Sequence, residues 1–270
     1  MHYDPVKRFL GSLFNRHPIS RKLFYRLLDI LLLRSWHLHK ALRAYRSSVP
    51  KDREVHVLDA GSGLGQHSWY LARKNPAWHI TAVDIKEEEL ESCASFFSGQ
   101  QLTNVVFEKQ DLTSYFKPDA FDLVLSVDVM EHIEEDEQVF SRLYASMKKG
   151  GLLLISTPSD QGGSDVRHPG GVSFIEEHVR DGYAAEELKQ KLQKAGFKTI
   201  ETHYTYGKPG SIAWRLSVKY PISLLNRSKA FLLLLPLYYI FVMPPVLILN
   251  KLDVVIKHKK GTGLLVKAWK

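Results

Sequence analysis

Three glycines and two acidic residues have the types and spacing of a site for a ligand that carries positive charge and hydroxyl groups. Gly61, Gly63 and Gly65 follow a short apolar run that ends in Asp59, and the next apolar run ends in Asp84. Glycines spaced in this way let the backbone approach a ligand closely at the carboxyl end of a strand. A dinucleotide fingerprint requires another glycine at position 66, where this chain has glutamine. A carboxylate before the loop also suits a cationic amino-acid ligand better than a pyrophosphate.

A second group of reactive side chains follows the apolar run at 121–127. Histidine titrates near neutral pH, so His132 is the first candidate for a general base, and Glu131 is a candidate for orienting a substrate or binding an ion. Local packing would explain either residue equally well. The long glycine-rich loop at 159–180 is expected at the same edge, where long loops often form substrate walls. Candidates for acceptor contacts in or beside this loop are Arg167, His168, His178, Arg180 and Tyr183.

Alternating strands and helices must position these groups. Short β-rich runs alternate with amphipathic helical patterns, which predicts βαβ units and a mainly parallel sheet with helices on both faces. The expected strands are 55–59, 79–84, 105–109, 121–127 and 152–156, and the expected helices are 66–74, 87–97 and 135–147. The sequence shows no internal repeat.

Five motifs together resemble the class I S-adenosylmethionine-dependent methyltransferases. They are VLDAGSGLG at 57–65, AVDI at 82–85, QDL at 110–112, FDLVLSVDVMEHI at 121–133 and KKGGLLLISTP at 148–158. The resemblance runs from about Val55 to Phe197, and it is most similar to ubiquinone-pathway and lipid-directed methyltransferases. It implies an α/β fold with a Rossmann-like seven-stranded sheet. The sixth strand would span 198–204, and the last strand, at 263–268, would pair with it antiparallel.

The resemblance also implies binding roles for particular residues. S-adenosyl-L-methionine is the implied cofactor, and no metal is expected. The loop would face the methionine part of the cofactor through Asp59, Gly61, Ser62, Gly63 and Gly65. Asp84 would hold the ribose hydroxyls, with Ile85 beside the adenine. Asp111 and Leu112 would contact the adenine, and Ser126 and Val127 would end the fourth strand next to the cofactor. Methyl transfer is an in-line displacement, so alignment of the acceptor is the main task of such a site.

Charge is distributed unevenly along the 270 residues. The net charge is +8 over residues 1–50, −9 over 51–200 and +9 over 201–270. Several carboxylates in the middle suit a cationic cofactor, and basic ends suit an anionic partner. The single cysteine, Cys93, excludes an internal disulfide framework and indicates a reducing compartment. We expect no signal peptide, because the apolar run 30–33 is too short.

An insertion at 206–262 separates the expected sixth and last strands. It contains Phe231–Leu249, nineteen residues without a charge, which is long enough to cross a bilayer. Because the flanking strands pair in one sheet, both ends of the insertion lie on one side, and a single crossing is impossible. Pro236, Pro244 and Pro245 argue against a plain straight helix. We expect a broken helical hairpin dipping into one leaflet; a hydrophobic cap or a dimer face are the alternatives.

The N-terminal segment 1–50 has the pattern of basic amphipathic helices. Leucine and phenylalanine recur at helical spacing, with arginine and lysine between them. Such helices lie on anionic membrane surfaces, or they pack on the domain as a lid; the two are compatible. No nucleic-acid partner is expected, because the basic residues are interleaved with apolar runs rather than with a nucleic-acid-binding module.

The sequence thus predicts a cofactor-binding core at 51–205, completed by a last strand at 263–270, between a basic lid at 1–50 and the 206–262 insertion. The function expected is methylation of a lipophilic small molecule: a quinone precursor, an aryl or polyene lipid, or a lipid-linked intermediate. Oxygen is preferred to carbon as the target atom. We expect a cytoplasmic protein, peripheral or monotopic on the inner face of the cytoplasmic membrane. The alternatives are a soluble methyltransferase with an apolar face forming a homodimer, and a non-catalytic cofactor-binding partner of a membrane complex.

Overall fold

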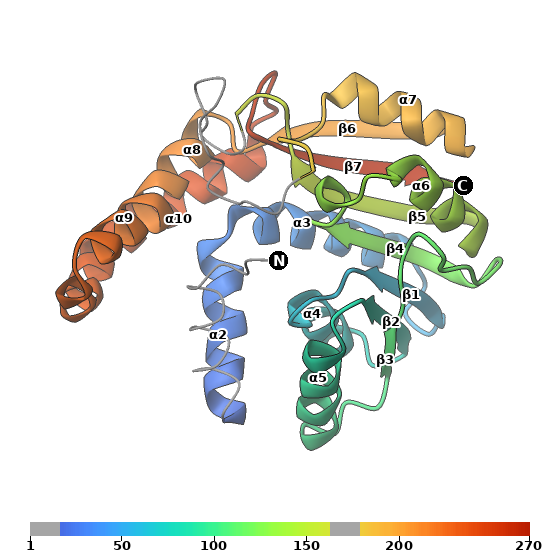
Figure 1. Cartoon of the computed structure of the whole chain (residues 1–270), viewed down its shortest axis with the longest axis horizontal. Helices are drawn as coiled ribbons and strands as arrows, with labels where there is room; N and C mark the ends of the chain where they lie inside the picture. The colour runs from blue at the N-terminus through green and yellow to red at the C-terminus, as the bar shows by residue number, and fades with distance from the viewer. Residues whose placement is uncertain (1–16, 163–178) are drawn as a thin grey trace.

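A seven-stranded mixed sheet forms the centre of the protein (Figure 1). The computed structural model describes residues 17–162 and 179–270. The strand order is β3-β2-β1-β4-β5-β7-β6; β7 runs antiparallel to both of its neighbours, and the other pairs are parallel. The predicted Rossmann-like methyltransferase sheet is therefore confirmed. Its strands are β1 (Val55–Ala60), β2 (Trp78–Asp84), β3 (Val105–Lys109), β4 (Phe121–Val127), β5 (Met147–Pro158), β6 (Thr199–Thr205) and β7 (Gly263–Trp269).

Helices cover both faces of this sheet, as the alternation of side chains in the strands requires. In β4, Leu123 and Leu125 point to one face and Val124 to the other, and all three are fully buried. The first face is covered by α3 (Leu33–Ser48), α4 (Gln66–Lys74) and α5 (Glu87–Gly99). The second is covered by α6 (Asp136–Ser146) and α7 (Ala185–Ala195). The strand ends that carry the candidate site lie between these two layers.

The boundary between α6 and β5 differs from the expected one. The helix ends at Ser146, and Met147 already pairs with Phe121 of β4, five residues before the expected strand start. Two lysines and two glycines separate Met147 from the apolar run of the strand. This polar stretch hides the strand start in the sequence, because the signal of a buried strand is a continuous apolar run.

The first described helix, α2 (Pro18–Leu31), is attached to the domain by a buried cation. The Arg21 guanidinium is 2% exposed and donates to the Ser92 carbonyl (2.9 Å), to Cys93 Sγ (2.9 Å) and to the carbonyl of Leu64 in the glycine loop (3.3 Å). The hydroxyl of Tyr25 donates to the same Leu64 carbonyl. The N-terminal helices therefore form a lid packed directly on the glycine loop.

The insertion between β6 and β7 forms a helical hairpin that projects from the domain, here called the arm (Figure 1). It consists of α8 (Lys208–Trp214), a π-helical turn at 215–219, α9 (Tyr220–Arg227), a 3-10 turn at 229–233 and α10 (Leu235–Val255). The hydroxyls of Tyr238 and Tyr239 donate to the carbonyls of Leu216 and Ser217 and hold the two sides together.

The helices of the arm are interrupted at positions other than the prolines that the sequence indicated. Pro236 lies in the first turn of α10, where no helical N–H bond is required. The helix continues through Pro244 and Pro245, which the sequence pattern had indicated as breaks. The break falls instead at the π-helical turn and at the 3-10 turn. The expected broken hairpin is present, with its apolar helix in one piece.

Asp253 fastens the arm to the domain. Its carboxylate is fully buried and accepts from His37 Nε2 of α3 (2.8 Å), from the Gly210 N–H of α8 (2.9 Å) and from the Tyr206 N–H (3.2 Å). His258 Nε2 lies 3.1 Å away. Burial alone would raise the pKa of Asp253, but the His37 hydrogen bond and the nearby His258 outweigh it and lower this pKa. One carboxylate thus joins α10 to the lid, to α8 and to the loop before β7.

Candidate functional site

The glycine loop joins β1 to α4 at the point where the strand order reverses, which is where open α/β sheets bind ligands. Gly61 has a φ of +81°, and a Cβ atom there would lie 2.4 Å from Val129 Cγ2. The N–H groups of Gly61 and Ser62 both donate to the Val83 carbonyl of β2 (2.9 Å each). The loop therefore needs a glycine at 61, and it lies directly against the segment that follows β4.

Two carboxylates flank this loop. Asp59 is 2% exposed and accepts from Ser68 Oγ (2.6 Å). Burial raises its pKa to about 6; the hydrogen bond from Ser68 opposes the shift, and the charge of Asp84 adds to it. Asp84 accepts from the Gly63 N–H (2.8 Å). A cationic ligand would stabilise the charged forms of both acids, so they are ready partners for a positive group.

Other features of the loop fit S-adenosylmethionine, which carries a sulfonium, an ammonium, two ribose hydroxyls and an adenine. Ser62 Oγ and Ser126 Oγ are buried and have no hydrogen-bond partner among the described residues. Buried polar atoms are normally bonded, so these two are open to a ligand. Ile85 is 54% exposed immediately after Asp84 and offers an apolar surface for a ring. Val127, at the end of β4, is half-buried beside them.

Asp111 and Leu112, which the family resemblance assigns to the adenine, lie in the turn after β3. The Asp111 carboxylate accepts from the N–H and the hydroxyl of Thr113 (2.8 and 2.7 Å), and these bonds lower its pKa. Leu112 is 6% exposed, and its side chain packs in the core. Both side chains therefore stabilise the turn, and any contact with an adenine would have to come from exposed backbone or carboxylate atoms of this segment.

The two candidate general bases lie in one short 3-10 turn, Met130–His132, but in opposite environments. His132 is exposed. Glu131 is fully buried; its Oε2 accepts from Thr157 Oγ1 (3.1 Å), and its Oε1 has no partner among the described residues. Burial and the charge of Asp128 raise the pKa of Glu131 to about 8, although Thr157 opposes the shift. A buried carboxyl that titrates near neutral pH is suited to proton transfer, and we rank Glu131 ahead of His132.

Sequence reasoning missed three residues here: Arg34, whose charge acts on Glu131, and His67 and Tyr206, which both interact with Arg34. Arg34 opens α3 and forms an ion pair with Asp128, and its backbone N–H donates to the Tyr206 hydroxyl (3.1 Å). Burial and the charge of Arg34 lower the pKa of His67 to about 3, so this imidazole is neutral. Only the position of His67, two residues after the glycine loop, was readable as a signal.

The acceptor candidates that the structure describes, Arg180 and Tyr183, are engaged in packing. Tyr183 is fully buried, and its hydroxyl donates to Asp136 (2.7 Å). Arg180 forms an ion pair with the same carboxylate and donates to the Ile133 carbonyl (2.8 Å). Both residues hold the segment after β4 in place; Tyr183 has no exposed surface, whereas 20% of the Arg180 side chain is exposed. Arg167, His168 and His178 lie outside the described residues.

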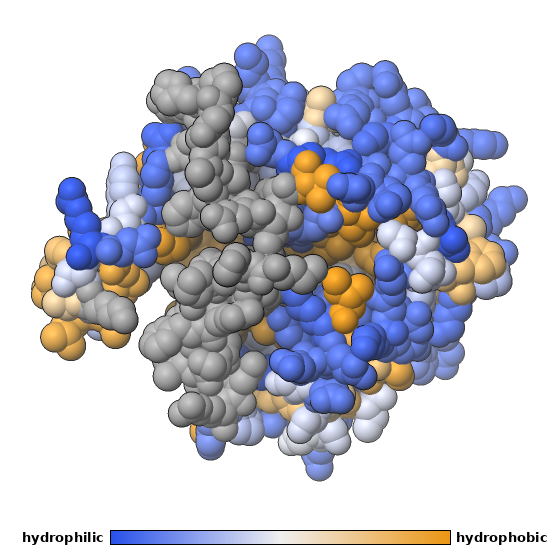
Figure 2. Space-filling model, viewed as in Figure 1, coloured by the Kyte–Doolittle hydropathy of each residue, from blue (hydrophilic) through white to orange (hydrophobic). Residues whose placement is uncertain are grey.

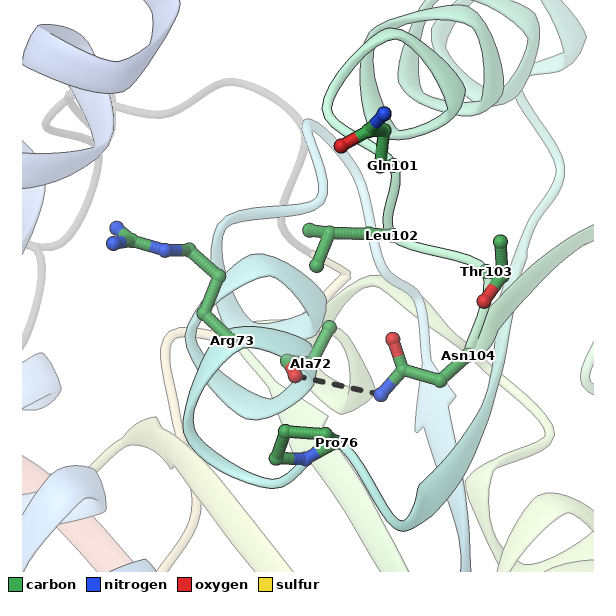
Figure 3. A pocket seen from close by; sticks show the side chains of 7 residues that line it. All are labelled: Ala72, Arg73, Pro76, Gln101, Leu102, Thr103 and Asn104. Carbon is green, nitrogen blue, oxygen red and sulfur yellow. Dashed lines mark hydrogen bonds between the residues drawn. The ribbon is translucent and has the colours of Figure 1, made fainter.

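A separate pocket lies at the opposite edge of the sheet (Figure 3). It is lined by the end of α4 and by residues 101–104, which precede β3, and Asn104 Nδ2 donates to the Ala72 carbonyl there (3.4 Å). This edge holds the amino ends of the parallel strands. Since the glycine loop lies at their carboxyl ends, the pocket is no part of the candidate site.

A family model described as a methyltransferase domain matches residues 51–203, more than half of the chain. The chain belongs to this methyltransferase family. The expected membership of the S-adenosylmethionine-dependent methyltransferases is confirmed, and with it the enzyme class and cofactor of this domain. The matched residues contain the glycine loop, both flanking carboxylates and Glu131.

Among curated methyltransferase relatives, the chain is 30% identical over 150 residues to a phosphoethanolamine N-methyltransferase of Triticum aestivum, covering 53% of this chain and 28% of the relative. It is 27% identical over 165 residues to a malonyl-[acyl-carrier protein] O-methyltransferase of a Paenibacillus species, covering 57% and 59%. The chain thus spans less than two thirds of the length of either relative. By their names, the first methylates a nitrogen atom and the second an oxygen atom.

Solved structures share the fold at low identity. A Haemonchus contortus phosphoethanolamine N-methyltransferase 2, solved with S-adenosyl-L-methionine, superposes with a TM-score of 0.58 at 19% identity, covering 92% of this chain and 60% of that one. The [4+2]-cyclase SpnF gives 0.58 at 20% identity, covering 88% and 81%. Because the same fold serves a cyclase as well, the acceptor must be argued from the residues of this methyltransferase.

Proposed function

We propose that this protein is a membrane-associated methyltransferase that transfers the methyl group of S-adenosylmethionine to a lipophilic small molecule at the cytoplasmic face of the membrane. The observation that supports the proposal is an exposed apolar stripe along α10. The same helix is 21 residues long, and only 11% of its most apolar window is buried. Soluble proteins rarely expose apolar surface of this extent unless it contacts a membrane or a partner.

The stripe follows helical spacing along one side of the arm. Its members are 45% to 71% exposed: Leu237, Ile240, Phe241, Ile248, Leu252 and Val255. The arm tip adds Leu233, which is 84% exposed, and Figure 2 shows the hydrophobic surface at the end of the arm. Burying such side chains in hydrocarbon contributes roughly 1 kcal/mol for each half-exposed residue, so the stripe contributes on the order of 5 kcal/mol or more.

A second apolar stripe lies on α2 of the lid. Ile19, Leu23, Leu27 and Ile30 are 38% to 70% exposed and recur every three or four residues. Their opposite face packs on the domain through Arg21 and Tyr25, as described above. Basic residues accompany both stripes, and each one near an anionic surface adds roughly 1 kcal/mol. Lid and arm together provide two apolar contacts on the side of the glycine loop.

The attachment of the arm favours a monotopic arrangement. Both ends of the insertion continue into β6 and β7, which pair in one sheet. The last turns of α10 are held in the domain, where Asn250 and Asp253 are buried. The buried side of these last turns is fixed to the domain, so the exposed stripe can enter only a single leaflet.

The chemistry would follow from the residues at the strand ends. S-adenosylmethionine, when bound, supplies a methyl carbon whose bond to sulfur is replaced by a bond to the acceptor, leaving a neutral thioether. Asp59, Asp84 and the two unpartnered serine hydroxyls would hold its charged and polar groups. The fraction of Glu131 that is ionised at neutral pH would take the proton that an acceptor hydroxyl loses. The lid, packed on the glycine loop, would exclude water from the transfer.

Two measurements test this proposal. The full chain is mixed with liposomes containing anionic phospholipid and floated on a density gradient; we expect it to float, and Phe241→Asp with Ile248→Asp to abolish flotation. Phe116→Asp is the matched control, because Phe116 is 56% exposed in the connection between β3 and β4. Transfer of labelled methyl into a total lipid extract should accompany flotation and stop in Asp59→Ala.

The outcomes separate the proposal from its alternatives. A wild-type chain that stays unbound and forms a dimer, which the two arm substitutions dissociate, would favour the apolar face as a dimer contact. Flotation without any labelled product, together with cofactor binding, would favour a non-catalytic partner of a membrane complex.

A further inference from the structure

Three elements that are distant in the sequence meet beside the glycine loop. Arg34 comes from the lid, Asp128 from the segment after β4 and Tyr206 from the start of the insertion. Arg34 is ion-paired with Asp128, and the Tyr206 hydroxyl accepts its backbone N–H at 3.1 Å. Asp128 follows β4 directly, next to the Val129 side chain that covers Gly61. This junction therefore lies where an acceptor would face the cofactor.

Polar atoms at this junction lack partners. Arg34 Nε, Glu131 Oε1 and His67 Nδ1 are each buried and have no hydrogen bond within the described part of the chain. The Glu131 side chain is fully buried, whereas the Arg34 side chain is 34% exposed and so can be reached. Native proteins rarely leave buried polar atoms unsatisfied, and three in one cluster indicate a site for a polar ligand group.

The charges of the cluster select the kind of ligand. Asp128 is compensated by Arg34. His67 is neutral, and the raised pKa of Glu131 leaves this carboxyl mostly protonated at neutral pH. An ammonium group would find no unpaired anion here. An acidic oxygen would find the unoccupied Nε edge of a guanidinium, which suits the fork geometry of a carboxylate or a phenolate.

We propose that Arg34, Glu131 and His67 form the binding site for the head group of the acceptor, and that this head is an acidic oxygen group, a phenol or a carboxylic acid. The inference rests on the proposed function and deepens it, because it assigns oxygen as the methylated atom. The apolar remainder of the acceptor would extend between the lid and the arm, since Arg34 of the lid and Tyr206 at the start of the insertion both belong to the junction.

The experiment compares three probes with the same tail: 4-hexylphenol, 4-hexylbenzoate and 4-hexylbenzylammonium. Each is titrated calorimetrically into the full chain saturated with S-adenosylhomocysteine at pH 7. We expect the phenol and the benzoate to bind at least about tenfold more tightly than the ammonium, since one charge-assisted hydrogen bond corresponds to about tenfold or more in affinity. Arg34→Gln should weaken benzoate binding by about tenfold, and it should strengthen ammonium binding because it leaves Asp128 without its cation.

A second variant shifts the affinity in the opposite direction. Asp128→Asn removes the anion that competes for Arg34, and asparagine tolerates the left-handed backbone at this position, where φ is +51°. Benzoate affinity should therefore rise several-fold. Arg34→Lys, which keeps the charge and loses the fork, should fall between wild type and Arg34→Gln and serves if the glutamine variant does not fold.

Equal affinity for the three probes, tighter binding of the ammonium, or unchanged benzoate affinity in both Arg34 variants would overturn the head-group site. The affinity for S-adenosylhomocysteine, measured in the same variants, reports whether the glycine loop is intact. Liposome flotation of Arg34→Gln should match wild type. A chain that fails to float but discriminates between the probes would refute the membrane proposal alone.

Discussion

The buried carboxyl of Glu131 makes the stability of this protein depend on pH in a direction opposite to that of most acidic residues. Glu131 is fully buried, and its pKa is raised from 4.5 to about 8, chiefly by burial. The folded protein therefore retains a proton that the unfolded chain releases above pH 4.5. The contribution of Glu131 to the free energy of unfolding therefore favours the folded state at low pH, and it is lost as the pH rises toward 8. Glu131→Gln removes the titration and retains an oxygen that accepts from Thr157.

The size of the effect follows from the linkage between proton binding and folding. Each pH unit inside the window between the two pKa values changes the free energy of unfolding by up to about 1.4 kcal/mol. Between pH 5 and pH 7 the wild type should therefore lose up to about 2.7 kcal/mol relative to Glu131→Gln, whatever the other groups contribute to both proteins. The glutamine variant becomes the more stable of the two as the pH rises.

Urea unfolding of both proteins at pH 5, 6, 7 and 8 measures this difference. Glu134→Gln, an exposed neighbour in the same segment, is the control and should track the wild type at every pH. Parallel curves for wild type and Glu131→Gln would refute the reasoning, because they would mean that Glu131 titrates normally in the folded protein. Such a result would also remove the physical basis for preferring Glu131 to His132 as the base.

Two further substitutions test the attachment of the arm and the glycine loop. Asp253→Ala leaves His37 and two backbone N–H groups without their acceptor and removes the carboxylate beside His258. It should destabilise the protein by about 3 kcal/mol and expose the arm to limited proteolysis, whereas exposed Glu186→Ala should do neither. Gly61→Ala combines a positive φ with a Cβ placed 2.4 Å from Val129, so its affinity for S-adenosylhomocysteine, measured calorimetrically, should fall at least about tenfold. Gly99→Ala meets nothing within 4 Å and should bind as the wild type does.

The central sheet and the cofactor side of the site were predictable because their signals are local. Each parallel strand is buried on both faces and is therefore a short apolar run, and β3 and β4 have the expected bounds. The glycine loop and its two acids lie at the ends of such runs. Their position in the sheet follows from the parallel topology alone, which places the carboxyl ends of the strands at one edge.

The acceptor side was not predictable because it depends on tertiary contacts. Arg34 is one of ten basic residues among the first fifty. It differs from the others because Leu32, in an extended conformation, separates α2 from α3 and places Arg34 in the first turn of α3, and the sequence does not reveal this break. Tyr206 adopts a positive φ of 53°, which no sequence signal indicates for a tyrosine. Glu131 and His132 are adjacent in a three-residue turn, and such a turn is too short for periodicity to show which side chain is buried.

Arm, lid and acceptor site are joined by a short series of contacts. Asp253 of the arm accepts the Tyr206 N–H at 3.2 Å, the Tyr206 hydroxyl accepts the Arg34 N–H at 3.1 Å, and Arg34 pairs with Asp128 beside the glycine loop. If membrane binding moves α10, the contact between Asp253 and Tyr206 changes. Arg34 then shifts only if its contact with the Tyr206 hydroxyl transmits the change. A double-mutant cycle of Asp253→Asn with Arg34→Gln, with benzoate affinity as the readout, measures the coupling energy between the arm and the acceptor site. Additive effects would mean that the arm only anchors the enzyme, whereas a coupling energy above about 0.5 kcal/mol would mean that membrane attachment also prepares the acceptor site.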